Sequence, residues 1–195
     1  MSVALSLRAR RDPSLAVSRR LRAAQLLHPA AHDNVQSPPM DVLTVIAAGL
    51  ARAVTGAELP LRAGERRDFA RLLATPAYEA WLIAWAPGGA LALHDHGGSR
   101  GAVHVAHGQL TETSTDARRD ARLRTRALAA GSGVAVPAER VHGVWNPGPR
   151  RALSVHVYSP PLSSMTFFEH GVDRSLIAAR TEFGDVAALE ERAHR

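Results

Sequence analysis

The residues best suited to chemistry in this chain are two histidines, His94 and His96, with Asp95 between them. They follow the turn residues 87–89, Pro-Gly-Gly, in a stretch that we expect to be extended. Because successive side chains of a strand point to opposite faces, His94 and His96 share one face and Asp95 takes the other. Two imidazoles on one strand make half of a metal site. One more inward histidine would complete a facial set of three nitrogens.

The third histidine, His142, comes from a later segment, residues 141–145. Glu139 stands three residues before His142, and Asp95 is one residue from either neighbour, so strand alternation turns both carboxylates away from the ligands. Three neutral ligands leave a metal ion with its full 2+ charge, which favours an anionic substrate. Imidazole alone does not select among iron, zinc, nickel and copper. The predicted metal ligands are His94, His96 and His142.

A further polar segment follows soon after His142. Ser154, His156 and Tyr158 alternate with two valines, so the three polar side chains share one face, which we expect to be the interior. A serine, a histidine and a tyrosine in one row can hold the phenol in a chosen orientation by hydrogen bonding. A purely structural polar cluster inside a barrel is the alternative interpretation.

These side chains need a scaffold, and the hydrophobic pattern predicts one. Residues Met40–Val54 have the spacing of an amphipathic helix, and Glu65–Leu73 is a second predicted helix with Phe69 and two leucines on its buried side. From Tyr78 onward, short apolar runs separated by glycine, proline and asparagine turns predict an all-β sandwich or barrel. The expected strands are 78–86, 90–96, 101–107, 109–115, 121–128, 133–136, 141–145, 151–158 and 165–170.

The chain length and these patterns predict one folded domain. Residues 1–39 are expected to form a loosely ordered arm, with a short helix around Ala16–Leu27. Residues 40–195 form the domain, with helices in 40–73 and a barrel over about 78–170. Residues 172–195 are expected to frame the barrel with a strand or a short helix.

Composition excludes several classes of function. The chain of 195 residues has no cysteine, which rules out disulfides and zinc–thiolate sites. No run approaches the about 18 apolar residues of a membrane span, and no secretory leader is recognisable, so a cytoplasmic protein without a membrane partner is expected. The net charge is +6, but six arginines against two aspartates in residues 1–40 carry +4 of it. We therefore predict no nucleic-acid partner.

The histidine segments resemble the two motifs of the cupin superfamily. The first motif is matched by Gly88, the His94–His96 pair and Gly108, and the second by the spacing of residues 131–146, from glycine through proline and histidine to asparagine. Two departures stand out, because Gly101 replaces the motif's glutamate and Glu139 replaces its inner glycine. The resemblance implies a jelly-roll β-barrel, here without the usual carboxylate ligand.

The run S-V-H-V-Y-S-P-P at 154–161, together with three histidines, resembles cysteine dioxygenase and the wider thiol dioxygenase family over roughly 69–169. The resemblance implies one ferrous ion per chain on three histidines, with cysteine bound through its thiolate and amine. Dioxygen then adds both atoms to sulfur and gives the sulfinic acid. Tyr158 would lie beside the iron with His156 and Ser154 behind it, and the Ser159–Pro160 bond would be cis. Family members are often monomeric, so a monomer is expected.

In the animal enzymes, a cysteine five residues after the second histidine ligand is cross-linked to this tyrosine. Gly101 holds that position here, so the phenol of Tyr158 stays without the cross-link, as in the bacterial branch. The family also places an arginine in a Y-x-R context before the first barrel strand to bind the substrate carboxylate. The matching segment is 69–71, Phe-Ala-Arg, which makes Arg71 the predicted carboxylate partner. We interpret the neighbouring Arg66 and Arg67 as a solvated helix face.

Other functions stay open at this stage. A dioxygenase of another small thiol, such as 3-mercaptopropionate, is one, although its family relatives carry glutamine at the Arg71 position. A non-catalytic metal-binding cupin and a zinc hydrolase are others. Residues 97–101 match G-x-S-x-G but lie between strands, outside the strand–turn–helix that a hydrolase elbow needs. Trp145, Met165 and Phe167 are candidates for pocket walls, while His104 and His107 are expected outside the site.

Overall fold

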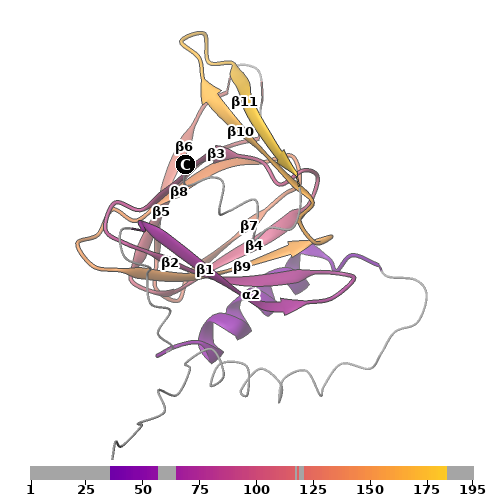
Figure 1. The fold of residues 1–195 in the computed structure, drawn as a ribbon, viewed down its shortest axis with the longest axis vertical. Helices are drawn as coiled ribbons and strands as arrows, with labels where there is room; N and C mark the ends of the chain where they lie inside the picture. Colours follow the sequence, from indigo (N-terminus) through magenta and orange to yellow (C-terminus); the bar gives the residue numbers. More distant parts are fainter. Residues whose placement is uncertain (1–35, 57–64, 117, 119–120, 184–195) are drawn as a thin grey trace, which may run out of the picture.

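The structure is a computed structural model that describes residues 36–56, 65–116, 118 and 121–183. Two antiparallel β-sheets face each other around an interior core, and one helix covers the outer face of the first sheet (Figure 1). The first sheet has the order β1-β2-β9-β4-β7 and the second β11-β10-β3-β8-β5-β6. The predicted arm helix Ala16–Leu27 and the end of the chain lie outside the described residues. Among the residues described, no helix is long and apolar enough to cross a membrane.

The elements in chain order are α2 (Met40–Ala53), β1 (Arg67–Ala74), β2 (Glu79–Trp85), β3 (Ala90–His94), β4 (Arg100–His107), β5 (Gln109–Thr115), β6 (Arg124–Ala129), β7 (Gly133–Val136), β8 (Val141–Trp145), β9 (Ala152–Ser159), β10 (Ser164–His170) and β11 (Leu176–Phe183). The prediction of an all-β barrel preceded by helices is confirmed in its fold class, with one described N-terminal helix where two were expected. Most strand bounds agree within two residues, and residues 176–183 form the framing strand.

Helix α2 covers the outer face of the first sheet, so this sheet is buried on both of its faces. Its apolar residues recur at helical spacing, and Leu43, Ala47 and Ala51 are buried against the outer side chains of β2, β4 and β9. Val155 and Val157 face this helix, so the residues that alternate with them must face the interior. All eight residues of β9 are consequently buried. The helix therefore determines which face of β9 carries the polar row.

The predicted second helix over Glu65–Leu73 is wrong. This segment contains β1, an edge strand antiparallel to β2, in which Arg67 pairs with Trp85 and Arg71 with Trp81. The register shifts between Arg71 and Leu73. An irregularity of this kind changes which residues share a face, so the leucines beyond it recur at a spacing that imitates a helix. The domain therefore has one described helix in the range 40–73.

Candidate metal centre

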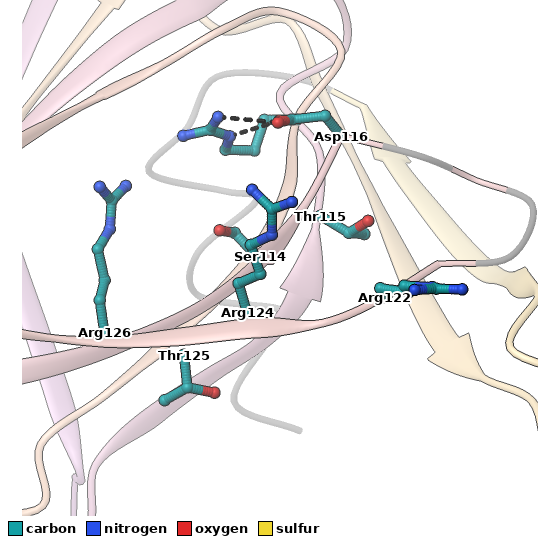
Figure 2. A pocket seen from close by; sticks show the side chains of 8 residues that line it. Ser114, Thr115, Asp116, Arg122, Arg124, Thr125 and Arg126 are labelled. Carbon is teal, nitrogen blue, oxygen red and sulfur yellow. Dashed lines mark hydrogen bonds and ion pairs between the residues drawn. The ribbon is translucent and has the colours of Figure 1, made fainter.

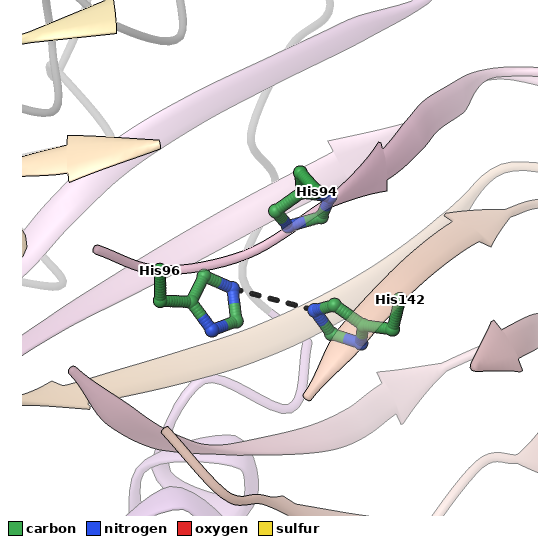
Figure 3. Close-up of side chains that lie close together, drawn as sticks. All are labelled: His94, His96 and His142. Atoms are coloured by element: carbon green, nitrogen blue, oxygen red, sulfur yellow. Dashed lines mark hydrogen bonds between the residues drawn. The ribbon is translucent and has the colours of Figure 1, made fainter. Parts of the chain in front are cut away.

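The structure brings the three predicted histidines together in the barrel interior. His94 ends β3 and stands opposite His142 of β8, while His96 follows in the connection to β4. Each ring is about 1% exposed, and one ring nitrogen from each residue lies within 4.8 Å of the others (Figure 3). The Nε2 atoms of His96 and His142 face each other at 3.3 Å. At these distances the three nitrogens can bind one metal ion placed between them.

Hydrogen bonds on the far side of two rings fix which nitrogen is available. Nδ1 of His94 donates to the carbonyl of Ala92 at 2.8 Å, and Nδ1 of His142 donates to Oε1 of Glu112 at 2.8 Å. In a neutral imidazole this leaves Nε2 as the lone-pair atom. Nε2 of His94 is buried with no hydrogen-bond partner among the described residues. A divalent cation would supply that partner, so the donor set fits a metal ion.

The protonation state of the cluster also suits a metal. Burial is the main cause that lowers the pKa of His94 and His96 well below the usual 6.5, and positive charge on His142 lowers both further. Because both rings are neutral at neutral pH, their lone pairs are available without proton loss. The environment thus favours binding of a cation over protonation of the rings.

Glu112 of β5 is a functional residue that the sequence interpretation missed. Its side chain is 0% exposed, and it accepts hydrogen bonds from Nδ1 of His142 and from Nε of Arg126. Burial acts to raise the pKa of Glu112, but the hydrogen bonds with His142 and Arg126 outweigh it and lower the pKa. A carboxylate behind a histidine ligand orients the ring and strengthens its donor nitrogen. The available signal was strand phase, since Glu112 lies two residues after the interior residue Leu110 and therefore shares its face.

Asp95 stays outside the ligand set, as its position between the two histidines predicted. One carboxylate oxygen accepts from the backbone amides of Gly97 and Thr166 at 3.2 and 3.1 Å. The other accepts from Arg118 at 2.8 Å. Asp95 therefore attaches the β3–β4 connection, which contains His96, to strand β10. Glu139, the other carboxylate considered, is exposed.

The predicted row on β9 is continuous and extends by one residue. Nε1 of Trp85 donates to Oγ of Ser154 at 2.9 Å, Ser154 is 3.0 Å from Nε2 of His156, and Nδ1 of His156 is 3.2 Å from the hydroxyl of Tyr158. Burial lowers the pKa of His156 to about 3, so its ring is neutral. Trp85 can only donate, whereas the serine hydroxyl can accept from both Trp85 and His156 or donate to His156, so the tautomer of His156 sets the direction of the two bonds that it makes.

Tyr158 lies against the metal cluster and against Gly101. Its ring centroid is 4.8 Å from that of His96. A Cβ atom at position 101 would lie 3.1 Å from Cδ1 of Tyr158 and 2.8 Å from the carbonyl of Val157. Gly101 thus allows β4 to approach the tyrosine more closely than a side chain would permit. The Ser159–Pro160 bond is cis, as expected.

Two arginines of β1 lie in the row that faces the interior tryptophans. The guanidinium of Arg71, the predicted carboxylate partner, is 5.4 Å from the ring centroid of Trp81, and its residue is exposed. Arg67 lies 5.4 Å from the ring centroid of Trp85 and is 1% exposed. After burial and the charge of His142, the charge of Arg67 also lowers the pKa of His94 and of His156. Its charge is therefore close to both the metal cluster and the polar row.

The remaining expectations concern the surroundings of the cluster. Met165 and Phe167 are buried in the interior core, and the ring of Phe167 is 5.9 Å from that of His94. Trp145 is only partly buried. His104 is partly buried and His107 is exposed, and neither belongs to the cluster.

The family model described as cysteine dioxygenase type I matches residues 62–171. Similar solved structures include TT1209 from Thermus thermophilus, at 25% identity over 50% of this chain and 86% of that chain, with a TM-score of 0.44. An oxalate oxidase in complex with the substrate analogue glycolate matches at 19% identity over 58% and 62%, with a TM-score of 0.48. The Cnp3 cupin domain of Schizosaccharomyces pombe matches at 13% identity over 51% and 68%, with a TM-score of 0.43.

Proposed function

Because the chain belongs to the cysteine dioxygenase type I family, we propose that it is a non-haem iron thiol dioxygenase that oxidises L-cysteine to cysteine sulfinate. The observation that carries the proposal is the buried set of three histidines beside the hydrogen-bonded phenol of Tyr158. The reaction adds both atoms of one dioxygen molecule to the thiol sulfur. The sulfur is oxidised, dioxygen is reduced, and no further reductant is needed.

One ferrous ion per chain is the proposed cofactor, held by His94, His96 and His142. When bound, it supplies the one-electron chemistry that lets a thiolate react with dioxygen. The chain's own contribution is positional. The three uncharged ligands favour an anionic thiolate, and Glu112 holds the ring of His142 in place.

Tyr158 and its row position the reacting groups in this proposal. In the proposed arrangement neutral His156 carries its hydrogen on Nδ1 and donates it to the phenol oxygen 3.2 Å away, which lets the phenol present its own hydrogen toward the site. The buried valines and tryptophans around β9 keep bulk water from this row. Ser154 and His156 are thus positioning residues, and Tyr158 is the proposed catalytic one.

For the substrate carboxylate, we favour Arg67 over Arg71. A guanidinium binds a carboxylate best where it is desolvated and close to the other binding groups. Arg67 is buried and its charge acts on His94, whereas Arg71, four residues further along β1, is exposed. The carboxylate of an amino acid bound at the metal would therefore meet Arg67.

An oxygen-uptake assay tests the substrate and the arginine together. Iron-loaded protein is supplied with cysteine, homocysteine, cysteamine or 3-mercaptopropionate. We expect uptake with cysteine, and the Arg67→Ala variant should lose at least tenfold in kcat/KM for cysteine but not for cysteamine, which has no carboxylate. Arg71→Ala is the matched control and should change little.

Three other results of this assay would change the proposal. No uptake with any of the four thiols would contradict the dioxygenase and leave a non-catalytic metal-binding cupin. Uptake with 3-mercaptopropionate alone would assign that thiol as the substrate. A larger loss of kcat/KM in Arg71→Ala than in Arg67→Ala would show that Arg71, the residue predicted from the sequence, binds the substrate carboxylate.

A further inference from the structure

A cavity beside strands β5 and β6 is lined by arginines that the proposed reaction does not use. One of its lining residues, Ser114, pairs with His142 of β8. The volume of the cavity is about 590 Å³, within the range of sites for small molecules of roughly 300–1,000 Å³. Four arginines line it, namely Arg122, Arg124, Arg126 and Arg140, together with three hydroxyl residues and one acid, Asp116 (Figure 2). Its lining contains none of the three clustered histidines, so this cavity is distinct from the metal centre.

Strand register explains why the arginines gather there. β6 is the edge strand of its sheet, and its Leu128 pairs with Leu110, both in the interior core. Arg126 and Arg124 continue the same face of β6, opposite Glu112 and Ser114. Figure 2 shows both arginines rising from one face of β6 while Thr125 points away. The inner face of the barrel thus changes from apolar to cationic at this open edge.

Three of the guanidinium groups at the cavity differ in their partners. Arg140 is held by Asp116 through two bonds, Nε to Oδ1 at 2.7 Å and Nη2 to Oδ2 at 3.1 Å. Arg126 donates to buried Glu112. No hydrogen bond or ion pair holds Arg124 within the part of the chain that the structure describes. Arg124 and Arg126 stand two residues apart on one face of β6, roughly 6.6 Å along the strand.

We propose that this arginine cavity binds a small polyanion that carries at least two oxyanion groups, such as a diphosphorylated metabolite. Planar guanidinium forks match oxyanions in two-bond geometry, and the hydroxyl of Ser114 adds a donor. Two guanidinium groups at this spacing select a ligand with two charged ends over one with a single charge. The site does not depend on the dioxygenase reaction.

The cavity is also connected to the metal centre. Arg126 donates to Glu112, which accepts from His142, so one chain of contacts joins the cavity to a metal ligand. A polyanion and Glu112 compete for the same guanidinium. Removing the charge of Glu112 should therefore release Arg126 and strengthen polyanion binding.

The test is a calorimetric titration of the iron-loaded full chain, without thiol, with propane-1,3-disulfonate at fixed ionic strength. This probe has two oxyanion groups and little affinity for metal ions. We expect saturable binding of one molecule per chain, and binding of propane-1-sulfonate at least tenfold weaker. Arg124→Ala, a change at an exposed position, should weaken disulfonate binding at least tenfold, and Arg126→Ala should do the same. Glu112→Gln should tighten it at least twofold.

Arg150→Ala removes an exposed arginine outside the cavity lining and is the matched control, with binding expected within twofold of the parent chain. Absence of saturable disulfonate binding by the parent chain would overturn the proposal. So would equal losses in the Arg124 and Arg150 variants. Unchanged or weaker binding in a folded Glu112→Gln variant would overturn the connection to His142.

Discussion

At the scale of single residues, the groups behind the cluster matter as much as the histidines. The carbonyl of Ala92 accepts a hydrogen bond from Nδ1 of His94, and the carboxylate of Glu112 accepts one from Nδ1 of His142. Nε2 of each ring is therefore left to bind a metal. At the far end of the polar row the indole of Trp85 donates to Ser154 and holds that hydroxyl in place. The metal-binding nitrogens of His94 and His142 are thus defined by neighbours that touch no substrate.

Gly101 is the position where one added carbon should disturb this arrangement most. In Gly101→Ala the new Cβ meets the carbonyl of Val157 at 2.8 Å and the ring of Tyr158 at 3.1 Å. We expect a loss of about 1–3 kcal/mol in the free energy of unfolding and a lower kcat, because β4 or the phenol must move. Denaturant unfolding and oxygen-uptake rates measure the two effects.

Gly49→Ala is the matched control for that substitution. Gly49 lies in α2 with no atom within 4 Å of the added Cβ, so alanine should raise helix stability by roughly 0.5–1 kcal/mol. If Gly101→Ala were as stable and as active as the parent chain, the close approach of β4 to Tyr158 would not be required.

At the scale of elements, the sequence predicted what depends on local periodicity. The alternation in residues 152–159 and the helical spacing after Met40 each predicted an element correctly, because one face of each is uniformly apolar. The edge strand β1 was missed because its register shift breaks the alternation. Arg67 was missed because its segment was interpreted as a helix, and Glu112 because its role depends on the pairing of β5 with β8, which places it against His142, 30 residues away in the sequence. No local pattern reports such pairing.

Helix α2 provides the prediction at this scale. Leu43 is 0% exposed and packs on the outer face of the first sheet, so Leu43→Ala should lower the free energy of unfolding by about 2–5 kcal/mol. Val45→Ala, in the same helix at 68% exposure, should change it by less than about 0.5 kcal/mol. Urea unfolding compares the two variants. Equal effects would mean that the helix does not cover the sheet in solution.

At the scale of the whole molecule, the fold keeps several ionisable groups away from water. Three histidines of the cluster, the histidine of the polar row, Glu112 and Arg67 are all buried in one barrel. The pKa values of His94, His96, His156 and Glu112 are all lowered in the folded protein. Acid should therefore destabilise the fold, because the unfolded chain binds these protons at a higher pH than the folded chain.

The pH dependence of stability follows from His156. Burial lowers the pKa of His156 from its usual 6.5 to about 3, so the unfolded chain binds this proton at a higher pH than the folded chain. The contribution of His156 to the free energy of unfolding is therefore fully present above about pH 6.5 and is lost as the pH falls toward about 3. Each such proton contributes a slope of about 1.4 kcal/mol per pH unit.

Urea unfolding of the metal-free protein between pH 6 and about 4 measures this slope. His156→Gln removes the titrating group, and the slope of that variant should be shallower by about one proton. A variant with the same slope as the parent chain would show that His156 becomes protonated in the folded state as readily as in the unfolded one.

The most direct test of the account is to follow the oxygen atoms. Iron-loaded protein is given L-cysteine and isotopically labelled dioxygen, and the product is analysed by mass spectrometry beside that of the His142→Ala variant. We predict cysteine sulfinate with both oxygens labelled from the parent chain, and neither retained iron nor sulfinate from His142→Ala. Unlabelled product, cystine alone, or equal sulfinate from the variant would contradict a dioxygenase built on three histidines.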